Sequence, residues 1–334
     1  MAMRESLTVT VSIDVEEEGL FCGRYRCTDV QVSNVASLGR LEPLFNRGIK
    51  PTLFCAYPVF EDAAACEALG RLLPKVEIGA HLHHWNTPPI AQNIPASGEL
   101  LAVPANQAPL QALDVKLGHL LASGRAFLGR DITSFRMGRW DLHRPMLELL
   151  ARHGIKIDAS VRPLHAWLNK DDGPNHFGAP PDPYWIELES GRILEAPLTV
   201  APIFGPLGLI PQTTSLGRKL AASLRHWGAL TLLPVNHPLW LLKLTALLHA
   251  ANGGRVLSLT WHSSEMMPGG APHMPNEAAV AMFLAKMWRY LDWLEKTFAV
   301  TYASLDELLA QPHPVCGLPG QPCDWTWKHA GHAI

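Results

Sequence analysis

Two short segments of the sequence hold side chains that together could bind a metal ion. SIDVEEE places Asp14 and Glu16 two residues apart, and EIGAHLHHW places His81 and His83 at the same spacing. In an extended chain, residues i and i+2 point to the same side, so each pair can face one pocket. Imidazole and carboxylate ligands suit Zn²⁺ and other divalent ions, and two histidines with one carboxylate leave positions open for water and substrate. His84 remains an alternative to His83.

Both segments stand at the ends of predicted strands. The β-branched run Thr8 to Ile13 ends at Asp14, and the apolar run Val76 to Ala80 leads directly into the histidines. A carboxylate that ends an apolar strand is not well explained as a solvated residue. Glu17 and Glu18, in contrast, are explained as well by a solvated acidic turn as by a role in the site.

The rest of the chain continues an alternation of strands and helices. Further strands are predicted at 52–57, 133–136, 156–158, 256–260 and near 300, a hairpin at 185–198, and helices at 36–47, 62–73, 109–128, 144–153, 215–227, 238–251 and 276–298. Such alternation predicts an α/β fold with a parallel sheet or barrel, in which ligands gather at the carboxyl ends of the strands. Arg136, Asp158 and His262 also fall at such ends.

The composition restricts which binding partners and which cellular location we expect. Among 334 residues, 28 Lys and Arg stand against 30 Asp and Glu, a formal charge of −2, so we expect no nucleic-acid partner. The N-terminal segment lacks the apolar core of a secretory signal, and no apolar run approaches the ~20 residues that span a bilayer. The apolar region 200–250 could lie on a membrane surface, but barrel helices are also apolar on one face. We expect a cytoplasmic protein with free cysteines; its oligomeric state is not fixed by the sequence.

The ordered set of motifs resembles the polysaccharide deacetylases, the NodB-homology group. The segments read SIDVEEE, EIGAHLHHWNTPP, SFRMGRWDLH and LSLTWHSSE, and VTYASLDELL resembles the closing strand and helix of that family. The resemblance covers about residues 6–310, with the motifs in the family's order. It implies a distorted (β/α) barrel as a single domain at 1–310, followed by an irregular tail at 311–334.

The resemblance also implies a reaction, the metal-dependent hydrolysis of an N-acetyl group on an amino sugar. By position, Asp14 resembles the catalytic base and Arg136 the arginine that orients it. His81 resembles the first metal histidine, and His262 the general acid. Asp158, on the strand after the Arg136 segment, is a candidate partner for His262.

Two departures from the family pattern concern the metal ligands. The second of two adjacent aspartates is replaced by Val15, which cannot bind a metal, so Glu16 is the expected substitute. The second histidine usually lies four residues after the first, where this chain has Trp85. We therefore expect His83 as the second histidine ligand and keep His84 in reserve.

These observations predict a hydrolase that uses a divalent metal ion, expected to be Zn²⁺, on an N-acetylated amino-sugar carbohydrate. Three tryptophans that adjoin the motifs are expected to line the substrate pocket: Trp85, Trp140 and Trp261. Two alternatives remain. One is a hydrolase of the same fold, with or without a metal ion, that acts on a non-peptide amide outside carbohydrate metabolism. The other is a sugar-binding relative that has lost turnover.

Overall fold

The computed structural model describes residues 4–23, 25–91, 94–165, 174, 176–203, 219–220 and 228–316. The helix predicted at 215–227 lies largely outside these residues, and so does the predicted tail beyond residue 316.

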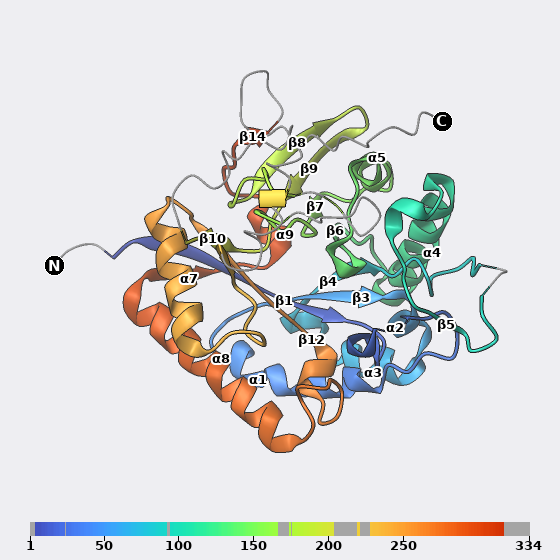
Figure 1. The fold of residues 1–334 in the computed structure, drawn as a ribbon, viewed down its shortest axis with the longest axis horizontal. Coiled ribbons are helices and arrows are strands. Elements are labelled where there is room, and N and C mark those ends of the chain that lie inside the picture. Colours follow the sequence, from blue (N-terminus) through green and yellow to red (C-terminus); the bar gives the residue numbers. More distant parts are fainter. Residues whose placement is uncertain are drawn as a thin grey trace.

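A ten-stranded, mostly parallel sheet forms the centre of the described chain (Figure 1). Its order is β12-β1-β3-β4-β6-β7-β9-β8-β14, and β13 pairs with β1. The strands are β1 (Ser6–Val15), β3 (Thr52–Ala56), β4 (Glu77–Leu82), β6 (Ser134–Met137), β7 (Ile157–Asp158), β8 (Tyr184–Leu188), β9 (Gly191–Glu195), β12 (Val256–His262), β13 (Ala299–Tyr302) and β14 (Val315–Cys316). Strands β3 and β4 are buried along their whole length, which is why they read as apolar runs rather than as alternation.

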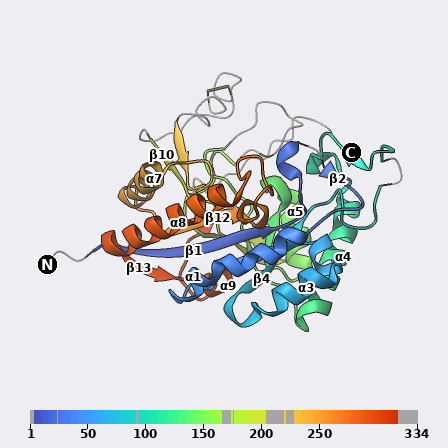
Figure 2. The same cartoon turned by 90° about the horizontal axis from the view of Figure 1, so that it is seen from below.

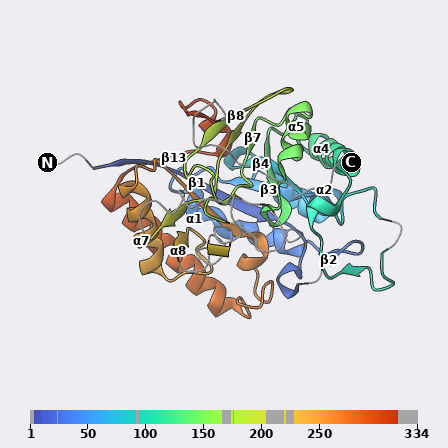
Figure 3. The ribbon, with the colours of Figure 1, turned by 45° about the horizontal axis from the view of Figure 1, so that its top comes forward.

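Helices lie around the strands, with α7 and α8 on one side of the molecule and α4 and α5 on the other (Figure 2, Figure 3). They are α1 (Glu42–Phe45), α2 (Tyr57–Glu61), α3 (Ala63–Gly70), α4 (Leu110–Leu128), α5 (Arg144–Arg152), α7 (Leu239–Ala251), α8 (Glu277–Thr297) and α9 (Leu305–Leu308). Two small antiparallel pairs add to these: β2 (Tyr25–Arg26) with β5 (Glu99–Leu100), and β10 (Val200–Pro202) with β11 (Ala229–Thr231).

Most predicted helix starts agree with the structure, and at α3, α8 and α9 a local side-chain cap marks the start. Asp62 caps α3 by accepting from the Ala65 N–H at 2.7 Å, and Ser304 with Glu307 forms the expected capping box of α9. The helix predicted at 36–47 is wrong in type: Ser33–Leu41 is a 3₁₀ helix, and α1 starts only at Glu42. Pro43 has no N–H and fits only the first turn of an α-helix, so no continuous α-helix passes through it.

The register of the parallel strands brings the polar residues at their carboxyl ends to the same end of the sheet. Asp14 lies opposite His262 on β12 and opposite Phe54 on β3. Along β4, His81 lies opposite Arg136 on β6. Because all these pairings are parallel, the side chains that follow Asp14, His81 and Arg136 emerge at the same end of the sheet.

A side chain links the chain after β9 to β12. There the Thr199 side chain makes the connection: its Oγ1 accepts from the Ser258 N–H at 2.7 Å and donates to the Val256 carbonyl at 3.5 Å. The expected α/β barrel class is confirmed, and the sheet extends into the segment expected to be irregular, where Val315 pairs with Trp185.

Two further expectations can be compared with the described residues. Within them, no helix is both long and apolar enough to cross a bilayer. Cys22, Cys27, Cys55 and Cys66 are free thiols, as expected. Cys316 is disulfide-bonded, so the expectation of free thiols is wrong for this residue.

The Thr199 bridge predicts a stability effect. Thr199→Val keeps the side-chain shape but leaves the buried Ser258 N–H without its acceptor, which costs about 1–3 kcal/mol. We expect the melting temperature to fall by a few degrees in Thr199→Val, measured by thermal unfolding. Thr199→Ser retains the hydroxyl and should lose less; equal losses in both variants would contradict the bridging role.

Candidate metal centre

Arg136 is a buried cation that connects three parts of the sheet. Its N–H groups donate to four acceptors: Asp14 Oδ1 (2.5 Å), Thr260 Oγ1 (2.9 Å), Ser12 Oγ (2.9 Å) and the Ala159 carbonyl (3.0 Å). The guanidinium also lies 4.3 Å from the centre of the Phe54 ring. Gly79 leaves room for that ring, since a Cβ there would stand 2.6 Å from it. Asp14 is thereby fixed as a buried, paired carboxylate.

Beside this pair, Glu16, His81 and His83 form a group that can hold a metal ion. All three residues are buried, and their ligand atoms lie within 4.8 Å of one another. Glu16 Oε2 is 3.2 Å from His81 Nε2 and 3.2 Å from His83 Nε2. Tetrahedral zinc with bonds of about 2.0–2.1 Å separates its ligands by about 3.3 Å, so the spacing fits such an ion.

The ring nitrogens that face away from this group are held by fixed partners. His81 Nδ1 is 3.0 Å from the Arg136 carbonyl, and His83 Nδ1 is 2.8 Å from Glu17 Oε2. Both acceptors favour a proton on Nδ1, which leaves the Nε2 lone pairs free for an ion, as is usual around metal-bound histidine. Trp85 donates its indole N–H to Glu17 at 3.0 Å and stacks on His83, with ring centres 4.2 Å apart.

Glu17 is therefore a functional candidate that the sequence did not single out. It is 1% exposed, not part of a solvated turn. Alternation predicts that Glu17 points away from Glu16, yet both carboxylates contact the His83 ring, Glu16 at Nε2 and Glu17 at Nδ1. Glu18 differs: its carboxylate accepts from Ser33 and from the Asn34 N–H.

His83, and not His84, belongs to this group. A Cβ at Gly138 would lie 2.5 Å from the His83 ring, so glycine is what allows that ring its position. His84 lies outside the three-residue group; its Nδ1 is buried without a hydrogen-bond partner. Burial lowers the pKa of His84 to about 4, although Asp141 opposes the shift.

His262 faces the same space from β12. Its Nε2 is 3.8 Å from Asp14 Oδ2 and 3.8 Å from Glu16 Oε1. Burial disfavours a charged His262, but Glu265, Glu16 and Asp14 outweigh burial and raise its pKa to about 10. Likewise, burial works against the ionised form of Glu16, yet His262 and the two other histidines lower its pKa well below the usual range.

Glu265 holds His262 from the next turn of chain. Its Oε2 accepts from the His262 backbone N–H at 2.8 Å and lies 3.0 Å from the ring Nδ1, while its Oε1 is 2.9 Å from His273 Nε2. The spacing of His262 and Glu265 is that of a capping box, here at the start of η7 (Ser263–Met266). That local pattern in WHSSE was the available sequence signal for this partner.

Asp158, which we expected beside His262, has other partners. Its carboxylate accepts from the Ser160 hydroxyl at 2.6 Å and from the Ser160 N–H at 3.2 Å. It lies opposite Glu195 in the β7–β9 register, and both carboxyls are buried. Burial first, and then the Asp158 charge, raise the pKa of Glu195 well above its usual range. Glu265 takes the place at His262 because a residue three positions away reaches the ring directly.

Of the three tryptophans expected at the pocket, Trp140 alone borders His262 on a partly exposed face. Its ring centre is 6.3 Å from that of His262, and its backbone has a left-handed φ of 53°. Trp261 is 1% exposed and packs on Phe283, because neighbouring residues of a strand point to opposite faces. Trp85 supports His83 and Glu17 and is 5% exposed.

Comparison with known proteins identifies the fold. No protein-family model and no curated protein matches the sequence. Among solved structures, a protein from Mycobacterium smegmatis assigned as a polysaccharide deacetylase has 15% identity over 95% of both chains, with a TM-score of 0.57. The fold is that of the polysaccharide deacetylases.

The same fold carries other reactions. An allantoinase matches with 14% identity over 91% of this chain and 89% of its own, at a TM-score of 0.51. A 4-alpha-glucanotransferase from Thermococcus litoralis matches with 12% identity over 93% of this chain and 41% of its own, at 0.54. Since these names describe different chemistries, the reaction has to be argued from the site and not from the deacetylase fold.

The role of Glu17 gives a prediction about metal affinity. Glu17→Gln removes the charge that holds the His83 ring, and loss of such an outer partner typically weakens metal binding about 10–100-fold. Zn²⁺ affinity can be measured by competition with a chromophoric chelator. Glu18→Gln is the matched control and should bind as the unaltered protein does; equal affinity in both variants would show that Glu17 does not support the site.

The buried Asp158–Glu195 pair predicts a pH effect on stability. In the unfolded chain Glu195 releases its proton near pH 4.3, but in the folded protein only at higher pH. Between these values the folded state binds more protons, so the free energy of unfolding falls as pH rises. Glu195→Gln keeps an N–H donor and does not titrate.

We therefore expect the melting temperature of Glu195→Gln, relative to unaltered protein, to rise by at least about 2 °C between pH 5 and pH 8. The exposed Glu187 on β8 provides the control Glu187→Gln, for which no such trend is expected. A difference that does not change with pH would contradict the protonated pair.

Proposed function

We propose that the protein is a metal-dependent hydrolase that removes N-acetyl groups from an amino-sugar carbohydrate. The observation that supports this proposal is that three sets of side chains lie close together in the protein. These are the Asp14–Arg136 pair, the Glu16–His81–His83 group, and His262 at 3.8 Å from both carboxylates.

The metal proposed for the group is Zn²⁺, held by Glu16, His81 and His83. Two imidazoles and one carboxylate are a donor set typical of catalytic zinc, and such a set leaves positions open. When bound there, the ion supplies polarisation of the acetamide carbonyl and a lower pKa for water at the site.

Asp14 is the proposed general base. Arg136 holds its Oδ1, so Oδ2 is the oxygen that remains to accept a proton from the attacking water. The ion pair keeps the carboxylate in one orientation, which a proton acceptor in a reaction requires. Ser12 and Thr260 fix the arginine in turn.

His262 is the proposed general acid. With Nδ1 bonded to Glu265, its Nε2 faces the reaction space and can donate a proton to the departing amine nitrogen. The partly exposed Trp140 ring beside it is the proposed wall for the sugar, since aromatic faces provide apolar contact in ligand sites.

The test is acetate release from N-acetylglucosamine oligomers by the zinc-loaded protein and by Asp14→Asn. Asparagine keeps an oxygen for Arg136 but is not a base, so kcat should fall by about 10²–10⁴-fold while zinc is retained. Asp131→Asn, at an exposed residue after α4, is the control.

Three outcomes would contradict the proposal. They are full turnover by Asp14→Asn, turnover that survives complete removal of metal, and the absence of acetate from any N-acetylated sugar. Hydrolysis of a ring amide such as allantoin without acetate release would favour an amidase of the same fold.

A further inference from the structure

Helix α7 presents an apolar side to the solvent. Trp240, Leu244 and Leu247 are exposed, Trp240 at 64%, and their i, i+4, i+7 spacing places them on one face of the helix. Ala251, the last residue of the helix, continues the same line and is also exposed. We call these four residues the α7 face. No polar residue lies on this line, so the α7 face differs from an ordinary solvated helix surface.

The uncharged polar residues of α7 lie on its inner side. Thr245 and His249 are buried, and His249 Nε2 is 3.1 Å from Asp182 Oδ1. The Thr245 hydroxyl donates to the Leu241 carbonyl at 2.8 Å. A surface helix normally turns polar residues to water and apolar ones to the core. With polar residues inside and apolar residues outside, α7 is suited to contact an apolar partner on its outer side.

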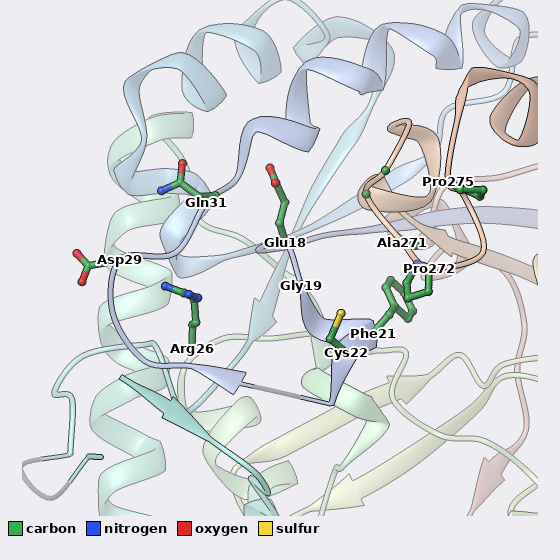
Figure 4. Close-up of a pocket in the computed structure, with 12 residues that line it drawn as sticks. Glu18, Gly19, Phe21, Cys22, Arg26, Asp29, Gln31, Ala271, Pro272 and Pro275 are labelled. Carbon is green, nitrogen blue, oxygen red and sulfur yellow. The ribbon is translucent and has the colours of Figure 1, made fainter. Parts of the chain in front are cut away.

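The position of α7 makes its outer side accessible to a flat surface. The helix lies at the periphery of the molecule, next to α8 (Figure 1, Figure 2). Phe21, another exposed apolar side chain, lies instead with Pro272 and Pro275 in a hollow (Figure 4). A bilayer is nearly flat over the length of one helix, so it contacts an outer helix and does not fill a hollow.

The size of the α7 face argues against a second copy of the chain as its partner. A helix of 13 residues is about 20 Å long, and a strip about 10 Å wide along it covers about 200 Å². Two such faces would bury about 400 Å², whereas stable protein interfaces bury at least about 1,200 Å². The helix is also shorter than the ~30 Å hydrocarbon core, so it would lie along a bilayer and not cross it.

The charges around the α7 face favour an anionic lipid surface. The sequence contains no Asp or Glu from residue 196 to residue 264, although the whole chain has 30. Lys243 is the one charged residue of α7, and its ammonium lies 5.4 Å from the centre of the Trp293 ring. Among the described residues, no carboxylate forms an ion pair with Lys243. A lysine beside exposed tryptophan and leucine is typical of helices that rest on anionic membranes.

We propose that α7 binds the protein to anionic lipid bilayers. The helix axis lies parallel to the bilayer, with Trp240, Leu244 and Leu247 among the headgroups and upper acyl chains, and with Lys243 near the lipid phosphates. This membrane contact does not depend on the proposed reaction, so either proposal can fail without the other.

Cosedimentation of the full chain with lipid vesicles tests the proposal. The apparent Kd is measured with vesicles of equal parts phosphatidylglycerol and phosphatidylcholine, and with vesicles of phosphatidylcholine alone. We expect binding to the mixed vesicles to be about 5-fold tighter, because each lysine near an anionic surface contributes about that factor. Lys243→Gln should lose this preference and keep its affinity for the neutral vesicles.

Two variants remove apolar side chains from the α7 face. Trp240→Ser, and Leu244→Ser combined with Leu247→Ser, should each weaken binding to both kinds of vesicle at least about 10-fold, since burial of one large apolar side chain contributes about that factor or more. Their melting temperatures should stay unchanged, because these positions are exposed. The control is Val115→Ser, at an exposed residue of α4 on the other side of the molecule, which should bind as the unaltered protein does.

Three results would overturn the proposal. The first is no binding of the unaltered protein to the mixed vesicles. The second is vesicle binding that Trp240→Ser and the double leucine variant leave unchanged, which would assign it to another part of the chain. The third is a dimer, detected by analytical ultracentrifugation, that Trp240→Ser dissociates, since the α7 face would then belong to a second copy.

Discussion

The burial of the Arg136 guanidinium is the constraint on which the rest of the site depends. A buried cation is tolerated only if its charge is paired and its N–H groups are hydrogen-bonded. Here the partners come from β1, β12 and the segment after β7, so all three must be in register for the arginine to be satisfied. The same demand fixes Asp14 as an oriented carboxylate. Arg136 thus stabilises the sheet and also orients Asp14, the proposed base.

Arg136 also connects the base to the metal group. Its side chain holds Asp14, while its backbone carbonyl lies 3.0 Å from His81 Nδ1 and orients that ring toward Glu16. Around the group, Glu16, Glu17 and Asp14 supply three buried carboxylates against one arginine. Burial disfavours a charged His83, yet Glu17 and Glu16 raise its pKa to about 10, which reports how strongly this pocket attracts positive charge. A bound divalent ion would be stabilised by the same carboxylates.

The sequence predicted what depends on local rules. Two-residue alternation placed Glu16, His81 and His83 together, and apolar runs located nearly every strand that carries them. The same rule missed Glu17, which contacts the other ring nitrogen of His83. The alternation of Trp261 with His262 argued against the pocket role that we had inferred for Trp261 from the resemblance. The bridge from Thr199 to β12 and the pairing of Asp158 with Glu195 could not be foreseen, since each joins residues distant in sequence through tertiary packing.

The most direct test of the central claim is the position of a metal ion in crystals of the zinc-loaded protein, located by anomalous diffraction at the zinc edge. We expect one strong site about 2.0–2.2 Å from a Glu16 carboxylate oxygen and from Nε2 of His81 and His83, with Asp14 still paired to Arg136. A site on other donors, or no site at these three residues under saturating zinc, would contradict it.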